Sequence, residues 1–187
     1  MFDYAAKFPA GLTYSEFLAH HGTDEQRKRW TDWSAHIKLT DAQKTLLGSF
    51  KRKMPVVVLA GAWCGDCVQQ CPIFEHFAAA SPALDIRYFD RDAHPDLAGE
   101  LKICGGGRVP VVVFLSEDYQ PLGLLGDRTL SKYRQLAQQQ LGDACPTGLG
   151  PANQELLTSV IQEWLNEFER CQLILRLSPR LRQLHGD

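Results

Sequence analysis

The sequence lacks an excess of charge of either sign and also lacks a long apolar run. It contains 20 Lys and Arg residues against 22 Asp and Glu residues in 187 positions, which gives a net charge of -2. A nearly neutral chain offers no general electrostatic attraction for nucleic acid or for anionic lipid. No segment approaches the roughly 20 consecutive apolar residues that span a bilayer. We therefore expect neither nucleic acid nor a membrane as a partner.

The first residues also lack the features of a secretory signal, since they contain an early acid, no basic cluster and no continuous apolar core. We expect a cytoplasmic protein, in which thiols are kept mostly reduced; a chain whose leader has been removed is the alternative. The six cysteines do not form a disulfide scaffold, because a chain of 187 residues can bury a core without one. The chain therefore does not need them as covalent links that stabilise the fold.

An apolar stretch that leads to two cysteines is the centre of the sequence. Residues 56–59 (VVVL) predict a buried strand, and the wider apolar spacing after Trp63 predicts a helix. Cys64 is then at the start of that helix, where unpaired N–H groups and the helix dipole favour an anion. This position predicts a lowered pKa for Cys64, whose thiolate would attack disulfides. Cys67, three residues later, has a spacing that suits a disulfide with Cys64.

The motif WCGDC at residues 63–67 resembles the WCGPC-type motif of the thioredoxin family. Pro72 follows the second cysteine by five residues, as the family's helix-bending proline does. Arg108, Val109 and Pro110 precede a β-branched run that resembles the family's cis-proline strand. Together these features are more specific than a CxxC motif alone. The resemblance covers roughly residues 50–141 and implies a thioredoxin-like α/β fold, with a mixed central sheet between helices.

The resemblance also implies a thiol-disulfide oxidoreductase that needs no bound cofactor. Cys64 would attack a substrate disulfide, and Cys67 would resolve the mixed disulfide. Protein disulfides would be the substrates, and an unknown reductase or glutathione would supply electrons. The alternative is an interaction or redox-sensing module without efficient turnover. The sequence leaves the direction of the reaction open. The residues expected to contact substrate are Trp63, Gly65, Arg108, Val109 and Pro110.

Three positions depart from the family's pattern. Val58 stands where many thioredoxins have a buried aspartate, and Tyr88 stands where the usual lysine partner lies on the next strand. That proton relay is therefore absent. Asp66 replaces the proline of the motif, one residue before Cys67. Either Asp66 takes or relays a proton from Cys67 during resolution, or it is only a favourable residue in the first turn of the helix.

Other thiols near the motif allow alternatives. Cys71 follows Cys67 by four residues, and a Cα separation of about 6 Å makes a strained Cys67–Cys71 bridge an alternative to a small buried apolar side chain. We expect no metal, because Cys64 and Cys71 would lie about 10 Å apart along a helix, too far to share one zinc ion. Cys104 is interpreted as an ordinary reduced thiol. Arg108 either attracts a carboxylate, as of an acidic peptide or glutathione, or is a solvated loop cation.

The chain is predicted to have helical extensions on both sides of the core. Residues 1–50 contain three short helices, each with a threonine capping box, that either pack on the core or bind a partner. Residues 51–141 form the thioredoxin-like core. Residues 142–187 form a Gly- and Pro-rich linker and a helix with an apolar stripe, which docks on the core or forms a homodimer interface. Monomer and homodimer are both open.

Overall fold

A computed structural model describes residues 2–141 and 154–186 of the chain. The predicted linker and Cys145 lie outside the described residues. Within the described ranges, four strands form one sheet in the order β2-β1-β3-β4. Strand β1 pairs in parallel with β2, and β3 pairs antiparallel with both β1 and β4, so the predicted mixed sheet is confirmed. The strands are β1 (Met54–Ala60), β2 (Leu84–Asp90), β3 (Val111–Leu115) and β4 (Pro121–Gly126).

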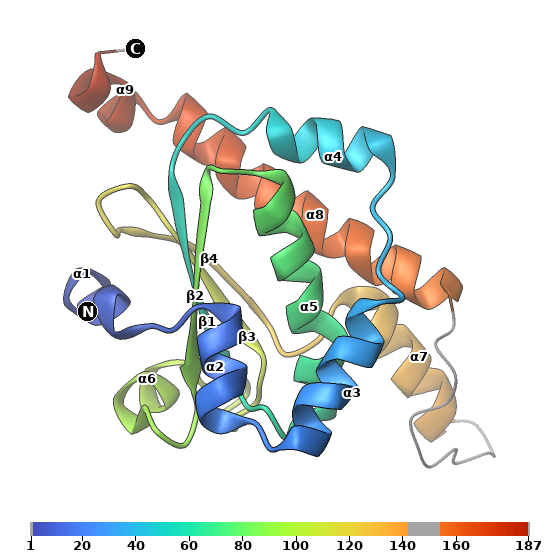
Figure 1. The fold of residues 1–187 in the computed structure, drawn as a ribbon. Coiled ribbons are helices and arrows are strands. Elements are labelled where there is room, and N and C mark those ends of the chain that lie inside the picture. The colour runs from blue at the N-terminus through green and yellow to red at the C-terminus, as the bar shows by residue number, and fades with distance from the viewer. Residues whose placement is uncertain (1, 142–153, 187) are drawn as a thin grey trace.

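The sheet is covered by helices on both faces. Helices α5 (Gly65–Ala80) and α8 (Gln154–Leu177) lie on one face, and α1 (Tyr4–Lys7) and α6 (Pro95–Glu100) lie on the other (Figure 1). All seven residues of β1 are buried, as expected for a β-branched run whose two sides are both covered. The centre of the core is therefore the strand that delivers the chain to the CxxC motif.

The N-terminal extension consists of short helices that begin as predicted. Helices α2 (Tyr14–His21), α3 (Asp24–Ser34) and α4 (Asp41–Gly48) each start with a complete threonine capping box, which satisfies two otherwise unpaired N–H groups. A 3-10 turn (Phe8–Ala10) links α1 to this region. The helices bury Phe17, Trp30 and Leu47 completely in the common core.

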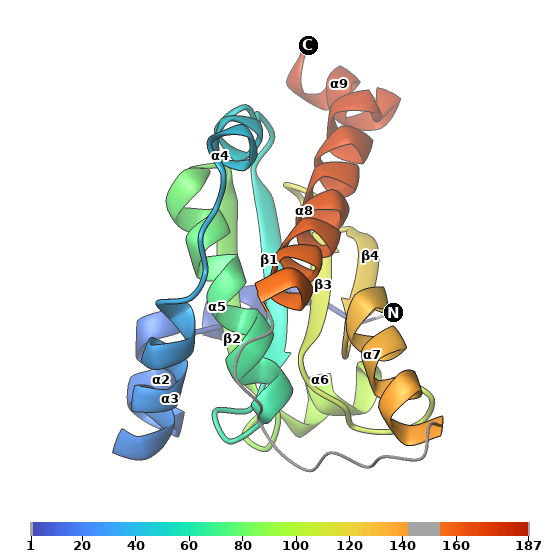
Figure 2. The ribbon, with the colours of Figure 1, turned by 90° about the vertical axis from the view of Figure 1, so that its right-hand side faces the viewer.

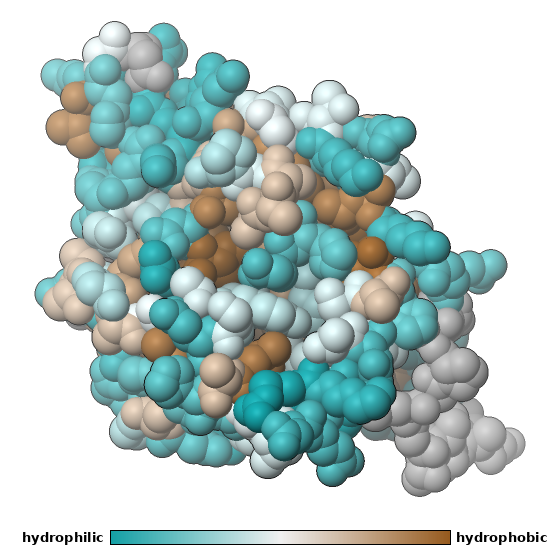
Figure 3. All heavy atoms as spheres, viewed as in Figure 1, coloured by the Kyte–Doolittle hydropathy of each residue, from teal (hydrophilic) through white to brown (hydrophobic). Residues whose placement is uncertain are grey.

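The outer surface of this region is mostly polar. On the face that carries α2 and α5, apolar residues occur in scattered patches within a largely hydrophilic surface (Figure 3). The apolar stripes of the N-terminal helices are thus used inside the molecule, where they cover the core.

The C-terminal helices complete the fold. Helix α7 (Leu130–Leu141) lies beside α8, near β4 (Figure 2). The apolar stripe of α8 docks on its own core: the ring centroids of Trp164 and Phe74 are 4.7 Å apart, and those of Phe168 and Phe114 are 4.9 Å apart. Among the described helices, none has both the length and the apolar composition needed to cross a membrane.

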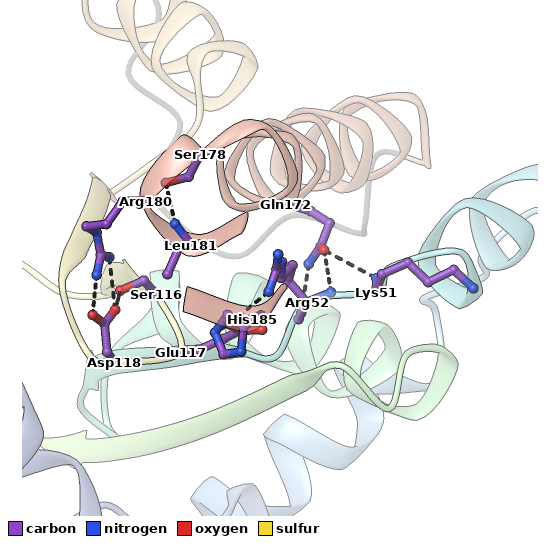
Figure 4. Close-up of polar contacts among 10 residues, drawn as sticks. All are labelled: Lys51, Arg52, Ser116, Glu117, Asp118, Gln172, Ser178, Arg180, Leu181 and His185. Atoms are coloured by element: carbon purple, nitrogen blue, oxygen red, sulfur yellow. Dashed lines mark hydrogen bonds and ion pairs between the residues drawn. The ribbon is translucent and has the colours of Figure 1, made fainter. Parts of the chain in front are cut away.

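Polar contacts hold the last helix, α9 (Pro179–His185), and the end of α8 against the core (Figure 4). The side-chain oxygen of Gln172 accepts the backbone N–H of Arg52 at 2.8 Å, and its amide nitrogen donates to the Arg52 carbonyl at 3.0 Å. Arg180 donates to the carboxylate of Asp118 at 3.0 Å. The C-terminal extension is therefore anchored at its far end by hydrogen bonds and an ion pair.

Candidate active site

Cys64 lies where the first strand of the core passes into helix α5. It is the N-cap residue of the helix and is half-buried. Its Sγ donates to the backbone oxygen of Val109 at 3.4 Å, across 45 positions of sequence. The Val109–Pro110 peptide bond is cis. The fold thus brings together Cys64, Val109 and Pro110, which the sequence analysis placed at one site.

Close packing of the loop beside Pro110 depends on a glycine. A Cβ atom at Gly126 would lie 2.5 Å from the carbonyl oxygen of Pro110 and 3.0 Å from the Cα of Val111. Such a separation is too short for any other residue, so the end of β4 can approach the Pro110 loop only with glycine at this position. The absence of a side chain here sets the position of the loop that faces Cys64.

Cys67 and Cys71 follow Cys64 into the helix and are both completely buried. All three thiols are free. Cys67 lies three residues after Cys64 and one helical turn before Cys71, and the thiols of both neighbours influence its pKa. Burial raises the pKa of the Cys67 thiol well above its usual value, and contact with the Cys64 sulfur lowers it in part. Among the described residues, no group of metal-ligating side chains has the arrangement of a metal site.

The pKa of Cys64 is raised, so its predicted lowering is wrong. The Cys67 side chain and burial raise the pKa, whereas the backbone N–H groups of Cys67 and Asp66 lower it. The helix terminus therefore supplies the hydrogen bonds that the sequence predicted. Their effect is outweighed because the half-buried sulfur loses solvent and faces a second sulfur. The strand-to-helix pattern predicts the backbone N–H groups at the start of the helix, but it contains no information about the burial of the sulfur or the nearby Cys67 side chain.

The carboxylate of Asp66 is directed at Arg128, in the loop before α7. Nη2 of Arg128 lies 2.6 Å from Oδ2 of Asp66, and only 18% of the Asp66 side chain is exposed. Arg128 also bonds Asp127 through Nη1 at 3.1 Å. Asp66 is therefore the first member of a charged chain that continues through Arg128 to Asp127. Its proposed part in proton transfer from Cys67 stays a prediction.

Asp127 is the buried centre of this chain. Its carboxylate accepts hydrogen bonds from Arg128, from the Tyr133 hydroxyl and from Nη1 of Arg108, the last at 3.3 Å. Burial raises the pKa of Asp127. The hydrogen bond from Tyr133, its own backbone N–H and the two arginines together lower the pKa by more, so the net shift is downward. Asp127 is thus held as an anion beside the Pro110 loop.

Gln70 connects this charged chain to the C-terminal extension. Its amide nitrogen donates to the backbone oxygen of Asp127 at 2.8 Å, and its side-chain oxygen accepts the indole N–H of Trp164 at 3.0 Å. The sequence analysis missed Gln70, Asp127, Arg128 and Trp164 as neighbours of the site. One signal was present: Gln70 is a polar residue on the same helical face as Cys67 and Phe74, where an apolar residue is expected.

Of the residues predicted to contact substrate, Trp63, Gly65 and Arg108 are at least partly exposed, whereas Val109 and Pro110 are buried. The Trp63 side chain is 43% exposed, and the Arg91 guanidinium lies 4.5 Å from the centre of its ring. An added Cβ at Gly65 would meet no atom within 4 Å. The Arg108 side chain is 48% exposed while it bonds Asp127. Trp63, Gly65 and Arg108 are the chain neighbours of Cys64 and Val109, whose contact joins the two segments, and we call the five predicted residues the rim of the site.

The two residues that stand where the family's proton relay would be are adjacent in the core. Val58 of β1 is paired in register with Tyr88 of β2, and both are buried. The Tyr88 hydroxyl donates to the backbone oxygen of Cys71 at 3.2 Å. Beneath the thiols the chain therefore has a tyrosine bonded to the helix backbone. Cys104 is exposed in the loop that precedes β3.

Comparisons with known proteins agree with this geometry. A family model described as thioredoxin matches residues 11–139. A crystal structure of a protein of unknown function from Pseudomonas aeruginosa has a TM-score of 0.70 and 17% identity, covering 91% of this chain and 97% of its own. An HIV epitope-scaffold has a TM-score of 0.64 and 18% identity, covering 89% and 99% of the two chains.

Thioredoxin 3 from mitochondria of Saccharomyces cerevisiae is 22% identical, with a TM-score of 0.35, and covers 57% of this chain and 97% of its own. No curated protein sequence matches the chain. At these identities, the likeness to the first two structures concerns the fold alone.

Proposed function

The chain belongs to the thioredoxin family, and from this premise we propose that it is a thiol-disulfide oxidoreductase in which Cys64 attacks and Cys67 resolves. One observation carries the proposal. The partly exposed Cys64 sulfur lies 3.4 Å from the Val109 carbonyl and is in contact with the buried sulfur of Cys67. A nucleophile that can reach a substrate, with a second thiol directly behind it, is the arrangement that disulfide exchange requires.

The proposed reaction has two exchange steps. The Cys64 thiolate attacks one sulfur of a substrate disulfide, the substrate S–S bond breaks, and the other substrate sulfur leaves as a thiolate that takes up a proton. Cys67 then loses its proton and attacks the Cys64 sulfur, which releases the second substrate sulfur. The substrate has gained two electrons, and the enzyme holds a Cys64–Cys67 disulfide. Another dithiol or glutathione must reduce that disulfide before the next turnover.

The rim residues would bind the substrate during these steps. We propose that a protein disulfide lies against Trp63, Gly65 and the backbone at Val109 and Pro110, with Arg108 placed to meet a substrate carboxylate. In the cytoplasm, a reductase or glutathione would return the pair to the dithiol form. No cofactor enters this scheme, since both electrons reside on sulfur.

The raised pKa of Cys64 favours a second candidate, a redox-sensing or interaction module with slow turnover. At neutral pH a raised pKa leaves little thiolate, and the thiolate is the reactive species. The two candidates differ in one measurable property. An oxidoreductase exchanges disulfides with many substrates in succession, whereas a sensor changes state once and holds it.

The redox equilibrium of the CxxC pair tests the proposal. The purified chain is equilibrated with graded ratios of reduced and oxidised glutathione, its free thiols are alkylated, and the products are mapped by mass spectrometry. We expect a reversible two-electron transition that links Cys64 to Cys67 and is lost in Cys64→Ser. The midpoint distinguishes a reductant from an oxidant. The proposal fails if this disulfide does not form at any ratio.

A further inference from the structure

Building on the proposed function, we infer that Cys71 is a third redox thiol of the site. It exchanges with the Cys64–Cys67 disulfide, forms a Cys67–Cys71 disulfide, and releases Cys64 as a free thiol. The inference begins from the place of Cys67, which lies three residues after Cys64 and one helical turn before Cys71 on the same face of α5, with Cys67 and Cys71 both completely buried. Nothing in the two-cysteine reaction uses Cys71.

The burial of the three sulfurs gives the exchange a direction. Cys64 is partly exposed, whereas Cys67 and Cys71 are completely buried on the same face of α5. Cys71 therefore cannot meet a protein disulfide itself, and the one disulfide within its reach is the bond that Cys67 makes. An oxidising equivalent that enters at Cys64 can in this way pass one helical turn inward.

Pro72 makes the turn between Cys67 and Cys71 easier to deform. Residues four apart on a regular helix have Cα atoms about 6 Å apart, near the upper part of the range that a disulfide accepts, so the bond requires a local shift. Pro72 lies inside α5 and has no N–H, so the helical hydrogen bond from this position to the Val68 carbonyl is missing. The turn that must shift therefore has one helical hydrogen bond fewer to break.

The chemistry balances without an added oxidant. The Cys71 thiol loses its proton and attacks Cys67, the Cys64–Cys67 bond breaks, and Cys64 leaves as a thiolate that takes up a proton. One disulfide is broken and one is formed, so the oxidation state of the site is unchanged. The backbone N–H groups of Asp66 and Cys67 that bond the Cys64 sulfur stabilise it as the leaving group.

The released Cys64 then gives the site a second state. It can attack a low-molecular-weight disulfide such as oxidised glutathione, form a mixed disulfide and release one thiol. Cys67 cannot resolve this mixed disulfide while it is bonded to Cys71. The fully oxidised site would then hold two disulfides, one internal and one that caps Cys64. A thiol that attacks the glutathione sulfur of the cap forms a disulfide with it and releases Cys64. Because a bond across one helical turn is strained, the Cys64 thiolate can then attack Cys67, release Cys71 as a thiol and restore the Cys64–Cys67 disulfide.

The position of Asp66 allows a direct test on the full chain. The protein is equilibrated with increasing oxidised glutathione, quenched with acid, alkylated and cleaved before aspartate residues. Cleavage before Asp66 and Asp85 gives a fragment, 66–84, that contains Cys67 and Cys71 but not Cys64. We expect this fragment to appear lighter by two hydrogen atoms and unlinked, together with fragment 41–65 carrying glutathione on Cys64.

Two serine variants provide matched controls, because Cys171 is also completely buried but contacts Glu167 and Arg170. Cys71→Ser should abolish the lighter fragment, and Cys171→Ser should leave it unchanged. The wild-type result is decisive even if a variant fails to fold. A fragment 66–84 that at every ratio is linked to 41–65 and alkylated at Cys71 overturns the inference while supporting the two-cysteine reaction. Failure of the proposed function differs, since fragment 66–84 is then never linked to 41–65 and is alkylated at both of its cysteines at every ratio.

Discussion

The two extensions contact the active-site helix in different ways, although both use tryptophan. On the N-terminal side, the indole N–H of Trp30 donates to the carbonyl of Ala62 at 2.9 Å, and that of Trp33 donates to the carbonyl of Gln69 at 3.0 Å. These bonds hold the backbone before and after the CxxC motif. The N-terminal extension therefore sets where Cys64 lies.

On the C-terminal side, the indole of Trp164 contacts a side chain. It donates to Gln70, and Gln70 donates to the backbone of Asp127, whose carboxylate binds Arg128 and Arg108. The C-terminal extension therefore supports the charges around the site. The position of Cys64 and the charges around it are therefore maintained by different extensions of the chain. Substitutions in one extension should change one of these properties without the other.

Truncation of Trp30 should have the largest effect. Trp30→Ala removes a completely buried ring and a buried hydrogen bond, and we expect a loss of about 3–5 kcal/mol in the free energy of unfolding. Trp33→Ala is the matched control, because Trp33 is only half-buried. Urea unfolding measures both. A larger loss for Trp33→Ala would contradict the role assigned to Trp30.

Substitution of Gln70 should have an intermediate effect on stability. Gln70→Leu leaves the Trp164 N–H and the Asp127 carbonyl without this partner, which should cost about 1–3 kcal/mol in the free energy of unfolding. The neighbouring Gln69→Leu removes a half-exposed bond from Lys132 and should cost less. Adding Trp164→Phe to Gln70→Leu should cost less than the sum of the two single changes, as a double-mutant cycle would show. Additive losses would argue against the bridge.

The charge of Asp127 should make stability depend on acidity. Its pKa is lower in the folded state, so its contribution to stability is complete above the unfolded value of about 4. The contribution is lost as pH falls through the folded-state pKa. Asp127→Asn should therefore give a shallower decrease in unfolding free energy between about pH 5 and pH 2. Acid titration of unfolding by circular dichroism measures this, and an unchanged slope would contradict the assignment.

The smallest effect is expected at α9, far from the thiols. Arg180 lowers the pKa of Asp118 to about 2, but both side chains are more than one third exposed. Arg180→Ala should therefore lower the free energy of unfolding least of the four changes, and only above the unfolded pKa of Asp118, near 4. The pKa of Asp118, followed by NMR, should rise toward that value. A cost that persists unchanged at pH 2 would show that Arg180 acts by packing.

The sequence predicted local features better than contacts between distant segments. Capping boxes at Thr13, Thr23 and Thr40 were predicted correctly because both partners lie within four positions. The proximity of Cys64 to Pro110 was predicted only through the family's motifs. The partnership of Asp66 with Arg128, 62 positions away, has no local signal. The raised pKa of Cys64 was missed for the same reason, since burial depends on which segments cover the sulfur.

The two edges of the sheet differ, and the difference limits how copies of the chain can associate. At the β2 edge, Leu12 exchanges two backbone hydrogen bonds with Tyr88, and the chain before α2 lies along the strand. Within the described residues, β4 pairs with β3 alone and leaves the opposite edge without a strand. The β2 edge is thus bridged at Tyr88, whereas the β4 edge carries no such bridge among the described residues, and pairing of two β4 edges would form a closed dimer.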